Sequence, residues 1–266
     1  MMRSRVCALV RKELLEVSRN PGILVPVAVV GALTVLLPFV VTVGIPFFTG
    51  EGLGADRELL RMSAVAGQHA DLGSDGRVQL YLHQQFLLLF LLLPMTGAMS
   101  VASHSVIGEK EARTLEPLLL TPISTLELLV AKVAAALVPT LVISFILFVL
   151  YLAGIGWLSE PGVLRAMLDM RTAALVALVG PAVALLSLQL AIVISSRVND
   201  PRTAQQFGVL IIIPLAAVLV AQATGWVWLS AGAVSLVGLG LLGAWVAVAL
   251  VSAALFDRET ILTRWR

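Results

Sequence analysis

Long apolar runs separated by short polar segments dominate the chain. Six runs of 17–28 residues contain no Asp, Glu, Lys or Arg, and a helix needs about 20 such residues to cross the hydrocarbon core of a bilayer. The pattern therefore predicts an all-α membrane protein, with six transmembrane helices in a single transmembrane domain. The predicted spans are 23–48, 86–107, 133–158, 173–194, 207–223 and 229–256.

The composition agrees with this class and excludes several others. Of the 266 residues, 59% are hydrophobic and 13% are charged, about half the charged share of a soluble domain. The single cysteine, Cys7, leaves no internal disulfide or paired-cysteine metal site. A net charge of +2 gives no indication of nucleic acid binding.

The positive charges predict an orientation. Of the 18 Lys and Arg residues, 13 lie in the two terminal segments and in segments 108–132 and 195–206. Because cytoplasmic segments of membrane proteins are enriched in these residues, both termini are expected in the cytoplasm. The opposite face then carries segment 49–80, which we expect to be a solvated loop with a short helix.

The N-terminal segment, residues 1–20, has the pattern of an amphipathic helix. One face carries Val6, Leu9, Val10, Leu14 and Val17, and the other Arg5, Lys12, Glu16 and Arg19. Such a helix lies at the membrane surface, and residues 20–22, Asn-Pro-Gly, are expected to end it. Glu13 projects from the apolar face with no cation on its own helix, so it is expected to pair with another element or subunit.

Some residues inside or beside the spans predict their shape. Prolines are expected to kink the spans, and small residues four apart in the last span would let another helix approach closely. The stretch 225–228 has a turn-like sequence. The prolines are Pro26, Pro38, Pro94, Pro139, Pro181 and Pro214, and the small pairs are Gly240 with Ala244 and Gly243 with Ala247.

Little in the chain predicts catalysis. The sequence has no zinc-helix, nucleophile-elbow or phosphate-loop motif. His104, beside two serines, is the one titratable side chain within the predicted spans, and we interpret it as a hydrogen-bonded interfacial residue. Five polar side chains could face a pathway or bond between helices, and both interpretations stay open. They are Gln84, Gln85, Ser100, Gln189 and Gln222.

Segment 108–132 joins the second and third spans. Ser124 and Glu127 have the spacing of a capping box, so a helix is expected to begin at Ser124 and continue into the third span. Thr114 can cap a short helix that carries Leu115 and Leu118 and ends before Pro122. A short apolar helix in the cytoplasm is either packed against the bundle or covered by another protein, and physical argument alone leaves both open.

The same segment resembles the signature of the permeases of type-two ABC exporters. Lys12-Glu13-Leu14 is similar to their N-terminal elbow helix, and residues 195–206 are similar to their second cytoplasmic loop. Arg113 departs from the pattern, since the family often has glycine there. The matching residues are Glu109-Lys110-Glu111, Thr114-Leu115-Glu116, Leu118-Leu119, Thr121-Pro122, Ser124, Glu127-Leu128-Leu129 and Lys132.

The resemblance implies a non-catalytic permease subunit, in a bacterial inner membrane, that pairs with a second copy or a paralogue. Each permease would dock a separate ATPase subunit through a coupling helix at about Thr114–Leu120. This chain would bind no cofactor, and ATP and magnesium would sit in the partner. The residues implied in coupling are Glu13, Glu109, Glu111, Arg113, Thr114, Leu115, Glu116, Leu118 and Leu119.

Two other functions remain open from the sequence. A passive channel or lipid scramblase would use segment 108–132 as a cap on the bundle, with no ATPase partner. An intramembrane enzyme would use His104, or His83 near the outer mouth. Neither the resemblance nor the composition identifies a substrate.

Overall fold

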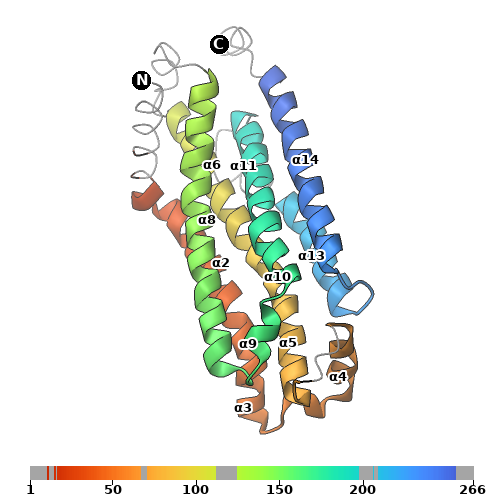
Figure 1. Cartoon of the computed structure of the whole chain (residues 1–266). Coiled ribbons are helices and arrows are strands. Elements are labelled where there is room, and N and C mark those ends of the chain that lie inside the picture. The colour runs from red at the N-terminus through yellow and green to blue at the C-terminus, as the bar shows by residue number, and fades with distance from the viewer. Residues whose placement is uncertain are drawn as a thin grey trace.

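The computed structural model describes residues 17–66, 71–111, 125–197 and 209–255, together with positions 11, 15 and 206. In this part of the chain every regular element is a helix, and the long helices run side by side as one elongated bundle (Figure 1). The elements are α2 (Pro21–Phe39), η1 (Val40–Gly44), α3 (Ile45–Thr49), η2 (Leu53–Ala55), α4 (Arg57–Ser63), η3 (Ala64–Ala66), α5 (Ser74–Phe86), η4 (Leu87–Leu91), α6 (Leu92–Glu111), α8 (Thr125–Leu158), α9 (Val163–Met167), α10 (Met170–Ala174), η5 (Leu175–Val179), α11 (Gly180–Arg197), α13 (Val209–Ala223) and α14 (Ala231–Leu255).

Each of the six predicted spans corresponds to a helical stretch, which confirms the all-α membrane class. Five stretches are long and apolar enough to cross a bilayer, and α13 contributes a shorter apolar helix, Ile212–Ala223. The predicted turn after α13 is also present at Gly225, whose φ of 72° lies in the left-handed region that favours glycine. The five long stretches are Pro21–Thr49, Ser74–His104, Val133–Leu158, Met170–Ile194 and Ala231–Val251.

The helical stretch that contains the second predicted span begins twelve residues before that span. We expected it to start at Phe86, but α5 starts at Ser74 and continues through η4 into α6. The prediction relied on the absence of charge, and Asp75 and Arg77 in the first turns of α5 violate that criterion. The stretch Ser74–His104 has 31 residues, about 46 Å of helix, which is longer than the roughly 30 Å of a hydrocarbon core. Its first turns, which include the exposed Arg77, can therefore extend beyond the bilayer and carry charge. The predicted loop at 49–80 is wrong for residues 74–80, while α4 supplies the short helix expected there.

Prolines alter two spans in a specific way. Two π-helical segments, η1 and η5, each end two residues before a proline, at Pro46 and Pro181. A proline has no N–H and its ring clashes with the carbonyl four residues back, so the preceding turn widens to the π form. Local hydrogen bonds support this geometry, as where the Thr42 hydroxyl donates to the Pro38 carbonyl at 2.8 Å.

The start of α2 shows why the chain breaks before the first span. Asn20 is extended, its side chain accepts a hydrogen bond from the Gly22 N–H at 2.9 Å, and Pro21 occupies the first helical position. This arrangement is an N-cap followed by a proline that needs no hydrogen bond. It confirms the predicted break at residues 20–22. The preceding positions 11, 15 and 17–19 are helical, and the elbow helix as a whole stays a prediction.

The bundle core is built in two parts around α6 and α11. One part consists of large side chains such as Tyr151, Leu87 and Met167. The other is rich in alanine, including Ala98, Ala136 and Ala184 on three different helices. Small side chains allow helices to approach closely in a membrane, so this second part is the tightly packed section of the bundle.

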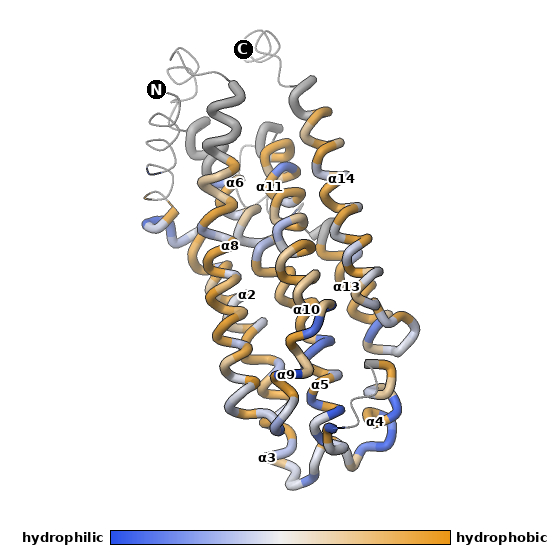
Figure 2. Tube along the Cα trace, in the orientation of Figure 1, coloured by the Kyte–Doolittle hydropathy of each residue, from blue (hydrophilic) through white to orange (hydrophobic). Residues whose placement is uncertain are grey.

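Most residues of α2, α8 and α14 are apolar (Figure 2), and many of their large apolar side chains are exposed. Just 11% of the α14 span is buried. The predicted close approach at Gly240 and Gly243 is not made by the described residues, since none of their atoms outside the local helix backbone lies within 4 Å of an added Cβ at either position. Gly238 makes the close contact, with Leu178 of η5, because it faces the bundle and the other two face outward.

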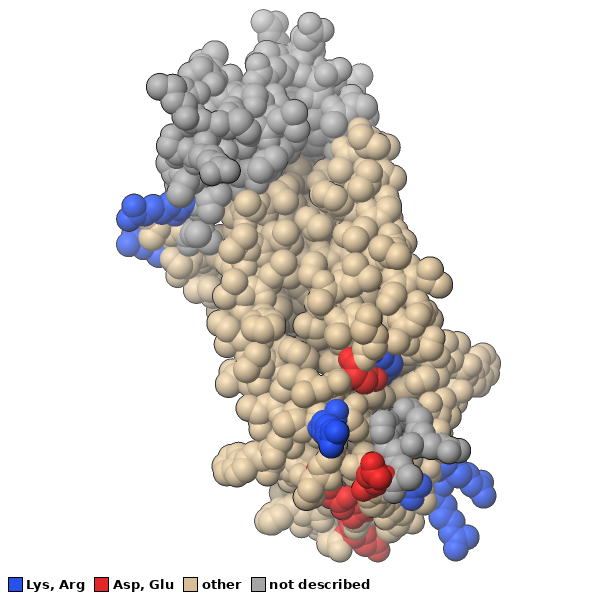
Figure 3. Space-filling view, viewed as in Figure 1, with Lys and Arg blue, Asp and Glu red and all other residues tan. Residues whose placement is uncertain are grey.

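Charges on the described surface gather toward the two ends of the bundle. Figure 3 shows a broad band without Lys, Arg, Asp or Glu over most of one face. We call the end that carries α3, α4 and α9 the distal end. The ends of α6, α11 and α14 and the start of α8 lie at the opposite end (Figure 1).

Candidate functional site

The segment implied in coupling lies between two of the longest helices. Glu109 and Glu111 belong to the last turns of α6, and α8 is continuous from Thr125 into the third span, in agreement with the helix predicted from Ser124. The structure describes the backbone of Glu109 and Glu111 but not their side chains. The other seven residues implied in coupling lie entirely outside the described part of the chain. They are Glu13, Arg113, Thr114, Leu115, Glu116, Leu118 and Leu119.

A cluster of buried and half-buried side chains, most of them polar, lies inside the bundle toward the distal end. We call it the Arg171 cluster. Arg171 is 3% exposed and Gln222 is fully buried, although a charged side chain is almost never fully buried without partners. The cluster consists of Tyr81, Gln84 and Gln85 from α5, Asp169, Arg171 and Thr172 at the start of α10, and Gln222 and Trp228 from the end of α13 and the following turn.

Arg171 contacts the connection between α13 and α14 in three ways. Its Nε donates to the Leu229 carbonyl at 2.9 Å, and its Nη2 donates to Gln222 Oε1 at 3.3 Å. Its guanidinium also lies 4.4 Å from the ring centre of Trp228, within cation–π range. The arginine therefore links the start of α10 to both sides of the turn at residues 224–230.

Helix α5 completes the cluster from the other side. The Tyr81 ring stacks on Trp228 with centroids 5.7 Å apart, and its hydroxyl donates to the Gln222 carbonyl at 3.4 Å. The Asp169 carboxylate caps α10 by accepting from the Thr172 N–H at 2.7 Å, and it interacts electrostatically with Arg171. A nearby carboxylate offsets part of the cost of burying the guanidinium.

The cluster is incompletely satisfied. Five of its buried polar atoms have no hydrogen-bond partner among the described residues. A buried polar atom left without any partner costs about 1–3 kcal/mol, so a partner for these atoms would stabilise the cluster. The atoms are Gln84 Oε1, Gln85 Oε1, Arg171 Nη1, Thr172 Oγ1 and Gln222 Nε2.

Sequence reasoning did not indicate that Arg171 is buried. We expected it in a connecting segment, with His104 as the one titratable group inside the spans. In the structure, Arg171 is part of the helical stretch Met170–Ile194 and is packed inside the bundle. Its partners Gln222 and Leu229 are 51 and 58 residues away in sequence, so no local pattern could indicate the contact. Gln84, Gln85 and Gln222 are in this cluster, whereas Ser100 and Gln189 are buried elsewhere.

His83 joins α5 to α8 through a second buried network. Its Nδ1 lies 2.7 Å from the Tyr151 hydroxyl, and its Nε2 lies 3.1 Å from Ser159 Oγ. The Tyr151 hydroxyl also donates to the His83 carbonyl at 3.3 Å. A ring that carries its hydrogen on Nδ1 satisfies all three bonds at once, with Ser159 donating to Nε2. The arrangement fixes the distal ends of both helices relative to each other.

Removing the Tyr151 hydroxyl is expected to destabilise the bundle. Tyr151→Phe leaves His83 Nδ1 buried without its partner, which costs about 1–3 kcal/mol. The midpoint of thermal unfolding in detergent should therefore fall by several degrees. Thr224→Val deletes an exposed hydroxyl and should change the free energy of unfolding by less than about 0.5 kcal/mol. Equal midpoints for the two variants would contradict a structural role of the His83 network.

His104 is hydrogen-bonded, as predicted. Its Nδ1 lies 2.9 Å from the Ser100 carbonyl one turn earlier in α6. On its other side the ring packs closely on the start of α2, since a Cβ on Gly22 would lie 2.9 Å from Nε2. Both contacts of His104 are those of a residue that packs α6 against α2.

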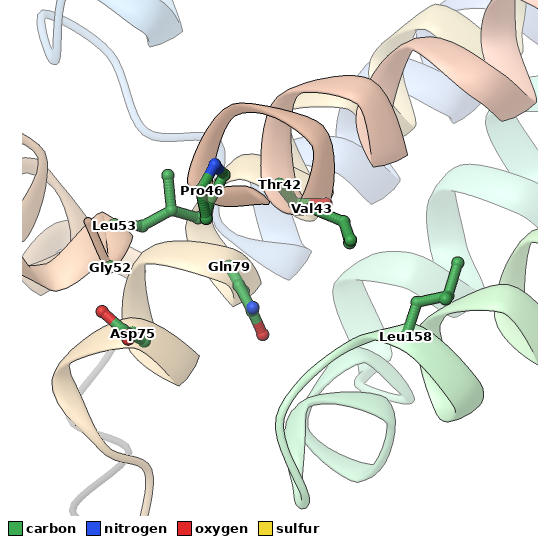
Figure 4. A pocket seen from close by; sticks show the side chains of 8 residues that line it. All are labelled: Thr42, Val43, Pro46, Gly52, Leu53, Asp75, Gln79 and Leu158. Carbon is green, nitrogen blue, oxygen red and sulfur yellow. The ribbon is translucent and has the colours of Figure 1, made fainter. Parts of the chain in front are cut away.

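A small cleft opens at the distal end, between the end of the first span and the start of α5. It has a volume of about 140 Å³ and is lined by Thr42, Val43, Pro46, Gly52, Leu53, Asp75, Gln79 and Leu158. Figure 4 shows Asp75 and Gln79 on one helix and Leu158 on another. The polar side chains are engaged, because Asp75 accepts from the Gly54 N–H and Gln79 Oε1 accepts from the Glu160 N–H. The described residues contain no group of three or more His, Cys, Asp or Glu that could hold a metal ion.

The long apolar helices, the uncharged band and the buried polar contacts between helices define an integral membrane protein with several helical spans. The sequence profile described as ABC-2 family transporter protein matches residues 74–227. This range covers more than half of the chain, from the start of α5 to the turn before α14, and the chain belongs to this family. It is therefore a transmembrane component of an ABC transporter, a kind of subunit that is normally non-catalytic. No individual curated protein matches the chain.

Proposed function

We propose that this chain is the permease of an ATP-driven exporter, that it forms the pathway as a dimer with a second permease, and that a separate ATPase docks on residues 109–127. The observation that carries the proposal is the family match over residues 74–227, which includes the whole segment that resembles the exporter signature. ABC transporters hydrolyse ATP in subunits or domains that carry a phosphate loop, and this sequence has no such motif.

The helices on either side of the docking segment suggest how the movement is transmitted. α6 ends at Glu111, and α8 runs for 34 residues from Thr125 to Leu158. A helix of that length spans about 50 Å at 1.5 Å per residue. Displacement of the short connection by an ATPase would therefore tilt two rigid helices that extend toward the distal end. ATP binding would bias the permease pair between two arrangements in this way.

The uncovered face of α14 and the exposed surfaces of α2 and α8 leave ample area for lipid and for a second permease. The excess of Lys and Arg in segments 1–22, 108–132, 195–206 and 257–266 supports a cytoplasmic location for both termini and for the docking segment. In this orientation the distal end, with the Arg171 cluster, faces the opposite side of the membrane.

Limited proteolysis tests the docking. In native inside-out membrane vesicles, trypsin should cleave slowly after Lys110 and Arg113, because a bound ATPase covers them. After peripheral proteins are stripped from the vesicles, cleavage at both sites should accelerate, whereas cleavage after Arg258 near the C-terminus should not change. Equal cleavage rates before and after stripping would contradict the proposal and favour a passive channel or lipid scramblase.

A further inference from the structure

The connection between α13 and α14 is held by apolar packing of partly buried residues, including Leu219 and Leu229, and by polar contacts to fully buried side chains. Among the described side chains of α13, Gln222 is the one that is buried, and its apolar neighbours such as Leu215 and Leu219 are partly exposed. In the turn, Trp226 is 87% exposed. Arg171 and Tyr81 therefore supply the hydrogen-bonded and ring-stacking attachments of this part of the chain to the rest of the bundle.

Hydrogen bonds of this kind differ from apolar packing, because water can take the place of either partner. Two of the acceptors are the Leu229 carbonyl and Gln222 Oε1, and water can replace either partner if the turn moves outward. The buried arrangement also leaves two donors unused, because Arg171 Nη1 and Gln222 Nε2 have no hydrogen-bond partner among the described residues. Moving the turn would bring both donors to water, which would offset part of the cost of breaking the two existing bonds.

A guanidinium suits this position for a geometric reason. Its planar fork donates in fixed directions and stacks on an aromatic face at the same time. Here the Nε and Nη2 donors reach two different segments while the plane covers Trp228. A single buried side chain thus fixes the end of α13, the turn and the start of α14 relative to α10.

From these contacts we propose that Arg171 is a positioning residue of the transport cycle, which latches the turn between α13 and α14 against α5 and α10 and keeps the distal end of the pathway closed. The role of Arg171 in a transport cycle rests on the proposed function, in which the chain is an ATP-driven permease. In this proposal the contacts of Arg171 in the structure define the closed state, and release of Trp228, Gln222 and Leu229 from Arg171 opens it.

The experiment measures the position of the turn directly. Spin labels are attached at Trp226→Cys in the turn and Trp157→Cys near the distal end of α8, two exposed positions outside the cluster, in a Cys7→Ser background. Distance distributions are then recorded in lipid nanodiscs, for the permease alone and for its complex with the ATPase. The wild-type permease should show one closed distance, and the complex trapped with ATP and vanadate should show a second, longer distance.

Arg171→Gln should populate the longer distance without nucleotide. Because it removes two charge-assisted hydrogen bonds and the cation–π contact, the ratio of open to closed molecules should rise at least about tenfold. Arg171→Lys keeps the charge without the fork and should give a smaller rise. Arg165→Gln, which removes an exposed arginine from the neighbouring helix α9, is the matched control and should leave the distribution unchanged.

Two results would overturn the latch. One is a distribution for Arg171→Gln that equals the wild-type one, and the other is a broad distribution that coincides with neither wild-type distance, as expected for simple loss of structure. If Arg171→Gln does not fold, Gln222→Met removes one acceptor at similar size and should shift the ratio in the same direction. The measurement on the permease alone needs no ATPase, so it tests the latch separately from the proposed function. A change in the distance distribution of Arg171→Gln in the permease alone, with no effect of ATP on any variant, would support the latch and contradict the ATPase coupling.

Discussion

Simultaneous Leu115→Ala and Glu116→Ala substitution should remove the ATPase from the purified complex while the permease stays folded. In the proposed coupling helix, Leu115 supplies an apolar contact and Glu116 a charged one, and a few such central residues carry most of the energy of an interface. The amount of ATPase that co-purifies should fall at least about tenfold, and transport should stop. The measurements are the subunit ratio by quantitative mass spectrometry and the thermal unfolding midpoint of the permease.

The distal end offers a matched control for this pair. Glu58 and Leu59 of α4 are likewise adjacent acidic and leucine residues, and they lie at the end of the bundle opposite to the predicted docking segment. Glu58→Ala with Leu59→Ala should leave the ATPase content unchanged. Retention of the ATPase and of transport in the Leu115 and Glu116 variant would disprove the assignment of the coupling helix.

Gly97→Leu should strongly destabilise the bundle. A Cβ on Gly97 would lie 2.7 Å from Thr140 Cγ2, where α6 crosses α8 in the alanine-rich part of the core. Thr140 is buried and its hydroxyl is bonded to the Ala136 carbonyl at 2.7 Å, so it cannot turn aside freely. Overpacking of this kind costs about 1–3 kcal/mol, and the unfolding midpoint in detergent should fall accordingly.

Gly240→Leu provides the comparison within the same chain. Gly240 is also helical, but in the described part of the chain no atom outside its local helix backbone lies within 4 Å of an added Cβ, and its face is exposed. The unfolding midpoint of the isolated permease should therefore stay within about 1 °C of the wild-type value. An equal loss of stability in both variants would show that the close contact between α6 and α8 is not what makes Gly97 necessary.

The helices could be predicted from the sequence because lipid imposes one simple rule on them. A span that faces lipid must be apolar, and the runs that became α2, α8 and α14 follow that rule closely. The stretch from Ser74 begins with polar turns that carry Asp75 and the exposed Arg77, so the absence of charge does not indicate where this helix begins. The absence of charge is therefore a good indicator of lipid contact and a poor indicator of the end of a helix that continues beyond the apolar run.

The two candidate sites differ in what the sequence reveals. The predicted coupling segment is a contiguous motif, and its resemblance to the exporter signature agrees with the family match over the same residues. The Arg171 cluster is assembled from three separate parts of the chain. The residues that neighbour Arg171 in the sequence do not indicate that it is buried against Trp228 and Gln222. Contacts across more than 50 residues depend on the packing of the whole bundle, which local patterns do not encode.

The most direct test of the proposed function is the composition of the native complex. The chain is purified in mild detergent from its own membrane, and the associated proteins are quantified by mass spectrometry. An ATPase with a phosphate loop, in an amount near equal to that of the permease, is the predicted result. A folded, dimeric permease that is repeatedly obtained without any such ATPase would contradict the coupling through residues 109–127 and favour a passive channel or lipid scramblase.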